Sequence, residues 1–156
     1  MIGKSDTPGI IPPPLIFAVG LAVGWGLTRV VVDPGLSVGW DVRRYVAFAL
    51  IAGGLLIDGA AAGHFRRLGT HPAPWKETTA LATDGLYRFS RNPIYIGFAM
   101  MYLGIAVAMN SLITVGLLAP CLIAIDRLAI VREEAYLAAK FGPAYEAYRK
   151  KVRRWL

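Results

Sequence analysis

The stretch TDGLYRFSRNPIYIGF, residues 83–98, joins the end of a polar loop to the start of a long apolar segment. Asn92 followed by Pro93 is a helix-start signature, because asparagine accepts hydrogen bonds from free main-chain amides and proline tolerates the first helical position. The positive end of such a helix, with Arg88 and Arg91 within one turn, would attract a carboxylate or phosphate. Taken alone, however, the motif favours a purely structural role, since arginines commonly flank the cytoplasmic end of a span.

Composition indicates a membrane protein. The 156-residue chain is 56% hydrophobic and carries a net charge of +7, and its mean hydropathy is +0.50. These values are too apolar for an ordinary soluble domain of this size. Cys121 is the single cysteine, so no internal disulfide is expected, and His64 and His71 do not form a metal-ligand pattern. We therefore predict no metal site.

Four apolar segments follow one another along the chain. They are residues 15–32, 45–63, 94–109 and 112–131. At about 1.5 Å per residue they approach or reach the roughly 30 Å of a hydrocarbon core, although the third covers only about 24 Å. Only two polar residues separate the last two segments, which predicts a helical hairpin. We expect an all-α integral membrane protein with about four transmembrane helices, the last two forming a tight hairpin.

The first segment resembles a signal peptide in position, but it is long and no Ala-x-Ala-like cleavage site follows it, so we interpret it as a retained span. Small residues four apart, such as Gly20 with Gly24, are expected to let the first two helices approach closely. Lysines and arginines concentrate in the second loop and from Arg127 onward, whereas the third loop has none. The positive-inside rule then predicts a multi-pass protein with both termini in the cytoplasm.

The C-terminal stretch VREEAYLAAKFGPAYEAYRKKVRRWL, residues 131–156, continues the fourth segment beyond the membrane. A helix stop at Gly142 and a new start at Pro143 are expected. In the last helix Tyr145 and Tyr148 share a face and the remaining surface is basic, which is typical of a helix that lies on an anionic membrane. Paired glutamates and tyrosines close to an arginine-rich helix start would also suit a zwitterionic ligand with an aromatic ring, while simple packing remains the alternative.

Three motifs resemble those of the integral-membrane methyltransferases that include isoprenylcysteine carboxyl methyltransferase and the phospholipid N-methyltransferases. They flank the predicted hairpin and together cover roughly residues 64–154. We expect the chain to form one membrane-embedded domain (1–156). Its first part (1–63) would hold two spans, and its second part (64–156) would be the methyltransferase core. The matching residues are Leu81, Thr83, Gly85 and Tyr87; then Arg91, Asn92, Pro93, Tyr95 and Gly97; then Glu133, Glu134, Leu137, Phe141, Gly142, Tyr145 and Tyr148.

This resemblance implies S-adenosylmethionine as methyl donor, with S-adenosylhomocysteine as product, in a pocket roofed by cytoplasmic C-terminal amphipathic helices. The acceptor would be a membrane lipid or another lipophilic small molecule. The donor's carboxylate, ammonium and sulfonium would suit a helix N-terminus, a glutamate and tyrosine faces. The implied cofactor-binding residues are Thr79, Ala80, Leu81, Ala82, Tyr87, Asn92, Pro93, Ile94, Tyr95 and Glu133.

Methyl transfer from a sulfonium depends on positioning and water exclusion, and it needs no covalent enzyme intermediate. An amine or thiol acceptor would need a proton acceptor, for which the candidates, in order, are Glu134, Asp58 and His64. Asp58 lies in an apolar segment, where a structural role is at least as well supported. Candidate substrate-binding residues are Arg91, Arg127 and Arg132. The family's carboxylate-binding arginine, four residues before the first glutamate, is replaced by Ala129, which argues against a prenylcysteine carboxylate as acceptor.

Other classes of function explain less of the sequence. A non-enzymatic membrane scaffold or accessory protein, binding anionic lipid through its basic tail, accounts for the charge and the spans but not for the tyrosine and glutamate spacings. A transporter is disfavoured because embedded charges are few and no inverted repeat is visible. Nucleic-acid binding is not predicted, because the basic residues follow membrane topology. The acceptor and the oligomeric state stay open.

Overall fold

The apolar segments form helices in the computed structural model, which describes residues 11–71 and 78–156. Within these two ranges all regular secondary structure is helical, which confirms the predicted all-α class. The helix η1 is a 3₁₀-helix and η2 is a π-helix. The elements are α1 (Pro13–Leu27), α2 (Trp40–Arg67), η1 (Gly85–Arg88), α3 (Pro93–Ala108), α4 (Leu112–Gly116), α5 (Leu118–Ile125), η2 (Asp126–Ile130), α6 (Val131–Phe141) and α7 (Pro143–Lys151).

Two helical runs are long and apolar enough to cross a membrane. They are α2 and the run Leu112–Phe141, which joins α4, α5, η2 and α6. The helices α1 and α3 are also apolar but contain only 15 and 16 residues. Large apolar side chains on α1 and α2 face outward, including Val19, Phe48 and Leu56. Outward apolar faces of this kind are typical of contact with lipid, and four spans stay a prediction.

The first span is shorter than the sequence predicted. The segment 15–32 was expected to be helical throughout, but α1 ends at Leu27. There the amides of Val30 and Val31 both donate to the Leu27 carbonyl, which closes the helix in a tight turn. Val32 is 91% exposed. Three consecutive β-branched residues restrict side-chain rotamers in a helix, which favours an extended exit from it.

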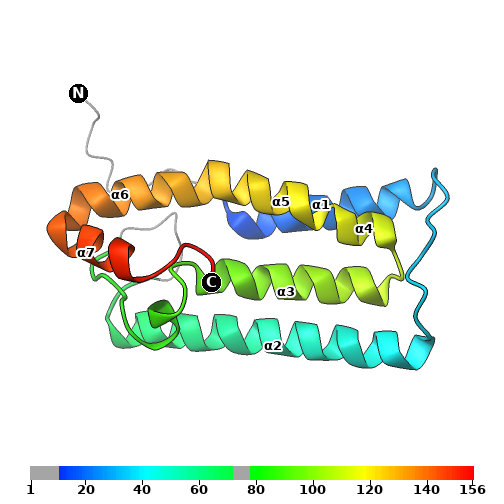
Figure 1. The fold of residues 1–156 in the computed structure, drawn as a ribbon, viewed down its shortest axis with the longest axis horizontal. Helices are drawn as coiled ribbons and strands as arrows, with labels where there is room; N and C mark the ends of the chain where they lie inside the picture. Colours follow the sequence, from blue (N-terminus) through cyan, green and yellow to red (C-terminus); the bar gives the residue numbers. More distant parts are fainter. Residues whose placement is uncertain (1–10, 72–77) are drawn as a thin grey trace.

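The helices run back and forth between two ends of the molecule (Figure 1). The chain passes along α1, returns along α2, and then forms the hairpin of α3 with the run Leu112–Phe141. Asn110 makes the hairpin turn with a φ of 55°, a conformation that asparagine tolerates better than most residues. The segment 78–92, α6, α7 and the C-terminus gather at one end, and the α1–α2 loop lies at the other.

The packing partner of α1 differs from the prediction. The small residues of α1 were expected to contact α2, but α1 packs on α3, α4 and α5. A Cβ atom added at Gly24 would lie 2.5 Å from Oγ1 of Thr114, on α4. The main partner of α2 is α3, where a Cβ at Gly54 would lie 2.7 Å from Cγ of Met101. The spacing of small residues in the sequence indicates a face that permits close packing, but it does not indicate which helix packs there.

Two buried clusters stabilise the bundle. The larger one lies between α1, α3 and α5, and it contains Phe17, Tyr102 and the buried Cys121. The smaller one joins the end of α2 to η1 and α7 through Ala61, Tyr87 and other tyrosines. Because the smaller cluster lies where the polar loop and the C-terminal helices meet, it supports the walls of the site described next.

Candidate functional site

The π-helix η2 aligns two acidic residues on one side of the long C-terminal run. Each residue of an α-helix turns by about 100°, so Asp126 and Glu134, eight positions apart, would lie about 80° apart on a regular helix. The additional residue of a π turn reduces this separation to about 20°. Both carboxylates therefore face the same neighbour, which is Arg154 near the C-terminus.

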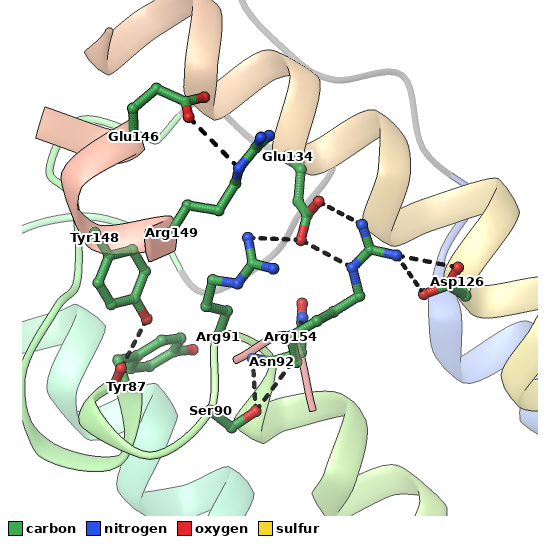
Figure 2. Close-up of polar contacts among 10 residues, drawn as sticks. All are labelled: Tyr87, Ser90, Arg91, Asn92, Asp126, Glu134, Glu146, Tyr148, Arg149 and Arg154. Carbon is green, nitrogen blue, oxygen red and sulfur yellow. Dashed lines mark hydrogen bonds and ion pairs between the residues drawn. The ribbon is translucent and has the colours of Figure 1, made fainter. Parts of the chain in front are cut away.

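Glu134 is the centre of a charged network (Figure 2). Its Oε1 lies 3.0 Å from Nη1 of Arg91, and its Oε2 accepts a 2.7 Å bond from Nη2 of Arg154. Arg154 also donates from Nε to Oε1 of Glu134, at 3.1 Å, and from Nη1 to Oδ1 of Asp126, at 3.0 Å. Two guanidinium groups thus hold one buried carboxylate, which fixes the position of Arg91.

The last four residues, 153–156, form a C-terminal strap that binds the start of α3. The amide of Arg91 donates to the Arg153 carbonyl at 3.0 Å. Nδ2 of Asn92 and Oγ of Ser90 donate to the Arg154 carbonyl, at 2.8 and 3.2 Å. Asn92 was expected to cap α3, and that prediction is wrong, because its side chain makes no capping bond and donates to the strap instead. Proline at the first helical position is confirmed.

The helix α7 contributes a tyrosine face. Gly142, with a φ of 52°, ends α6 and lets the chain turn back, so the predicted stop and the new start at Pro143 are confirmed. Tyr145 is 1% exposed and Tyr148 is 8% exposed. The Tyr148 hydroxyl donates a 2.7 Å bond to the Tyr87 carbonyl. Burial raises the pKa of Tyr148, so this hydroxyl stays protonated and serves as a donor.

These elements enclose a pocket at the end of the bundle that carries the C-terminus. The space inside the pocket, including the solvent at its open mouth, is about 690 Å³. Within the lining, the Tyr95 hydroxyl donates a 2.8 Å hydrogen bond to Oε2 of Glu133. The lining residues are Phe65, Thr78, Ala80, Leu81, Ala82, Tyr87, Arg91, Asn92, Ile94, Tyr95, Glu133, Glu134, Leu137, Tyr145 and Tyr148.

Most of the predicted cofactor-binding residues line this pocket. Thr79 does not, because its amide donates to Oγ1 of Thr70 at 2.9 Å and its side chain is exposed. Pro93 is buried at the start of α3 and is not part of the lining. The predicted residues in the lining are Ala80, Leu81, Ala82, Tyr87, Asn92, Ile94, Tyr95 and Glu133.

The other predicted site residues divide into two groups. Arg91 and Glu134 line the pocket. Asp58 lies outside its lining, with its carboxylate against Gly97 at the α2–α3 contact.

His64 also lies outside the lining, with Nε2 2.8 Å from Oδ1 of Asp84. Arg127, 77% exposed in its side chain, and Arg132 both face outward.

Five lining residues were missed as site residues by the sequence analysis. Leu137, Tyr145 and Tyr148 were identified as motif residues, and their spacing was the signal that would have assigned them to the pocket. Phe65 and Thr78 come from the end of α2 and the following loop. Nothing in the sequence marks these two, because only the fold brings that loop against α6.

The polar groups of the pocket suit a ligand that carries both signs of charge. Arg91 and the N-terminus of α3 offer positive potential. The amide of Ile94 has no acceptor among the described residues, so it is available to an anion. Glu133, bound by the Tyr95 hydroxyl, offers an acceptor for a cation. Tyrosine and phenylalanine rings form much of the remaining wall, which suits an aromatic group or a cation.

Comparison with known proteins gives a family match and two partial relatives. The family model described as phospholipid methyltransferase matches residues 42–144. The chain is 40% identical over 72 residues to protein-S-isoprenylcysteine O-methyltransferase of Schizosaccharomyces pombe, covering 46% of this chain but only 30% of that protein. It is 49% identical over 47 residues to an uncharacterized protein of Haemophilus influenzae, covering 30% of this chain and 73% of that protein. No solved structure matches the chain.

Proposed function

The chain belongs to the phospholipid methyltransferase family, and from this premise we propose that it transfers a methyl group from S-adenosylmethionine to a lipophilic acceptor at the membrane surface. The family match and the S. pombe relative confirm the resemblance drawn from the three motifs. The names of the family and of that relative both describe acceptors with long apolar chains. Such molecules dissolve in a bilayer, and two helical runs of this protein are apolar enough to cross one.

The observation that carries this proposal is the meeting of three distant sequence segments in one pocket. Residues 80–82, residues 87–95 and Glu133 of α6 contribute eight of the ten residues predicted to bind the donor. The eight are Ala80, Leu81, Ala82, Tyr87, Asn92, Ile94, Tyr95 and Glu133.

The polar groups of the pocket match the two ends of an amino acid. Arg91 and the free amide of Ile94 would hold the donor carboxylate. Glu133, oriented by the 2.8 Å bond from the Tyr95 hydroxyl, would hold the donor ammonium. The segment 80–82 would lie along the adenosine. When bound, S-adenosylmethionine supplies an electrophilic methyl group on a sulfonium.

The remaining work of the protein is positioning and water exclusion, because direct displacement at a methyl group needs no enzyme nucleophile. Phe65, Leu137 and the tyrosines provide an apolar wall for that purpose. Of the three predicted proton acceptors, Glu134 alone lines the pocket, and its ion pairs with Arg91 and Arg154 favour an anchoring role. The identity of the proton acceptor stays a prediction.

We also propose that the pocket opens to the cytoplasm. The pocket lies at the end of the bundle that gathers the second loop and the C-terminus. That end carries the predicted cytoplasmic excess of lysine and arginine. A water-soluble donor and a lipid-dissolved acceptor would meet there.

The test is calorimetric titration of the detergent-purified full chain with S-adenosylmethionine and S-adenosylhomocysteine. Wild-type protein is expected to bind both saturably. Glu133→Gln should weaken binding at least about tenfold, because a charge-assisted hydrogen bond contributes about 1.5–3 kcal/mol. Glu146→Gln is the matched control, since Glu146 is a partly exposed glutamate paired with Arg149 outside the pocket lining, and the affinity of this variant should match wild type.

A folded, monodisperse wild-type protein that binds neither compound would refute the proposal and leave the lipid-binding scaffold as the stronger interpretation. Equal affinities of Glu133→Gln and wild type would refute the role of Glu133 alone. If the donor binds, incubation with methyl-labelled S-adenosylmethionine and separate phospholipid, isoprenylcysteine and thiol acceptors would then identify the acceptor class.

A further inference from the structure

The start of α3 lacks the cap that its sequence encodes. An asparagine at this position normally accepts hydrogen bonds from first-turn amides. Here Nδ2 of Asn92 donates 2.8 Å to the carbonyl of Arg154, 62 residues away, and its main-chain amide donates to Oγ of Ser90. The amides of Tyr95 and Ile96 both donate to the Asn92 carbonyl. The first turn therefore keeps one amide, that of Ile94, with no acceptor in residues 11–71 and 78–156.

The same strap also fixes the charged group beside that amide. The main-chain amide of Arg91 donates to the Arg153 carbonyl, and its side chain pairs with Glu134. Glu134 in turn is held by the Arg154 guanidinium, which is itself anchored on Asp126. Both the main chain and the side chain of Arg91 thus depend on the C-terminal strap.

We infer that the C-terminal strap, through Arg154, positions the end of the pocket that binds the carboxylate of the methyl donor. The inference rests on the proposed function. Arg154 does not line the pocket, so it acts as a positioning residue, through Glu134 on Arg91 and through its carbonyl on Asn92. A carboxylate bound by the Ile94 amide and Arg91 would replace the missing cap of α3.

Side-chain contacts of Arg154 and Trp155 hold the C-terminal strap in place. Trp155 packs against the larger buried cluster. Arg154 makes hydrogen bonds with both carboxylates that the π turn aligns. Because these contacts all lie outside the adenosine segment 80–82, the strap should affect one end of a bound donor and leave the nucleoside end unchanged.

That difference gives a direct test by comparing two probes. S-adenosylhomocysteine carries the amino-acid end, whereas 5′-methylthioadenosine has the nucleoside and thioether but no carboxylate or ammonium. Titration of full-length Arg154→Gln is expected to show at least a tenfold higher Kd for S-adenosylhomocysteine and an unchanged Kd for 5′-methylthioadenosine. Arg154→Lys should recover part of the loss, because a lysine reaches one carboxylate but cannot bridge two.

A second variant keeps the test decisive if Arg154→Gln does not fold. Asn92→Asp cannot donate to the Arg154 carbonyl and would itself cap the Ile94 amide, so the same selective loss is expected. Arg149→Gln removes an equal charge from an exposed pair on α7 and should match wild type with both probes.

Equal loss of both probes, or no loss in either variant, would overturn the inference while leaving the proposed function intact. Wild-type protein that binds neither probe would instead overturn the proposed function, and the positioning role of Arg154 with it.

Discussion

Replacing Glu134 by glutamine tests how the charged network contributes to stability. The substitution retains the shape of the side chain but leaves two guanidinium groups facing a neutral amide. Arg91 is the more strongly affected partner, because its side chain is only 11% exposed and Glu134 is its only ion-pair partner within residues 11–71 and 78–156. Arg154 is 34% exposed and keeps Asp126, with donor–acceptor distances of 3.0 and 3.3 Å.

The expected loss follows from this asymmetry. Removing one partner of a buried ion pair costs about 3–5 kcal/mol. The upper part of that range does not apply, because Arg154 retains a carboxylate and access to solvent. We therefore expect Glu134→Gln to reduce the free energy of unfolding by about 3 kcal/mol, most of it from the uncompensated charge of Arg91.

Reversible unfolding in mixed detergent micelles, followed by circular dichroism, measures this change. Glu146→Gln is the control, because its pair with Arg149 is 43% and 49% exposed, and surface pairs contribute about 0–1 kcal/mol. If the two variants lose the same free energy within error, the network does not behave as a buried one, and the reasoning from its burial is refuted.

Three further substitutions test helix packing and helix capping by the same unfolding assay. A Cβ at Gly104 would lie 2.7 and 2.9 Å from atoms of α2, so Gly104→Ala should cost about 1–3 kcal/mol. Gly116→Ala has nothing within 4 Å and should be neutral or stabilising by up to about 1 kcal/mol; a reversed order would contradict the observed α2–α3 contact. The Ser111 hydroxyl accepts the amide of Thr114 at the start of α4 and also bonds Asp33 and Oγ1 of Thr114, so Ser111→Ala should cost at least about 1 kcal/mol, and an unchanged midpoint would show that these bonds are dispensable.

Local signals predicted much of the fold because they act within a few residues. Hydrophobicity identified four helical segments, and the tail was divided correctly at Gly142 and Pro143. The end of α1 was misplaced by five residues, because Val30 and its neighbours are apolar and so resemble a continuing span. Hydrophobicity does not register the lower helix propensity of consecutive β-branched residues.

Several pocket residues that belong to a recognised motif were predicted. Pocket residues that reach the site only through tertiary contacts were missed. Tyr95 and Glu133 were assigned from the resemblance of their motifs to the methyltransferase family, and both line the pocket. Phe65 was not, because its role depends on the loop that folds against it. Asp58 and His64 were chosen for their chemistry alone, and the fold places both outside the pocket lining.

The sequence by itself determined the helical class, the hairpin, the segments that form the pocket and the family. The helical class and the hairpin follow from apolar segments and turn residues, whereas the pocket segments and the family follow from the resemblance of three motifs to a known family. Only the tertiary structure decided that Asn92 binds the C-terminal strap instead of capping α3, and that a π turn aligns Asp126 with Glu134 for Arg154. Those arrangements join groups 20 to 62 residues apart, and the competition between a local cap and a distant acceptor is settled only when the packed helices bring that acceptor within reach.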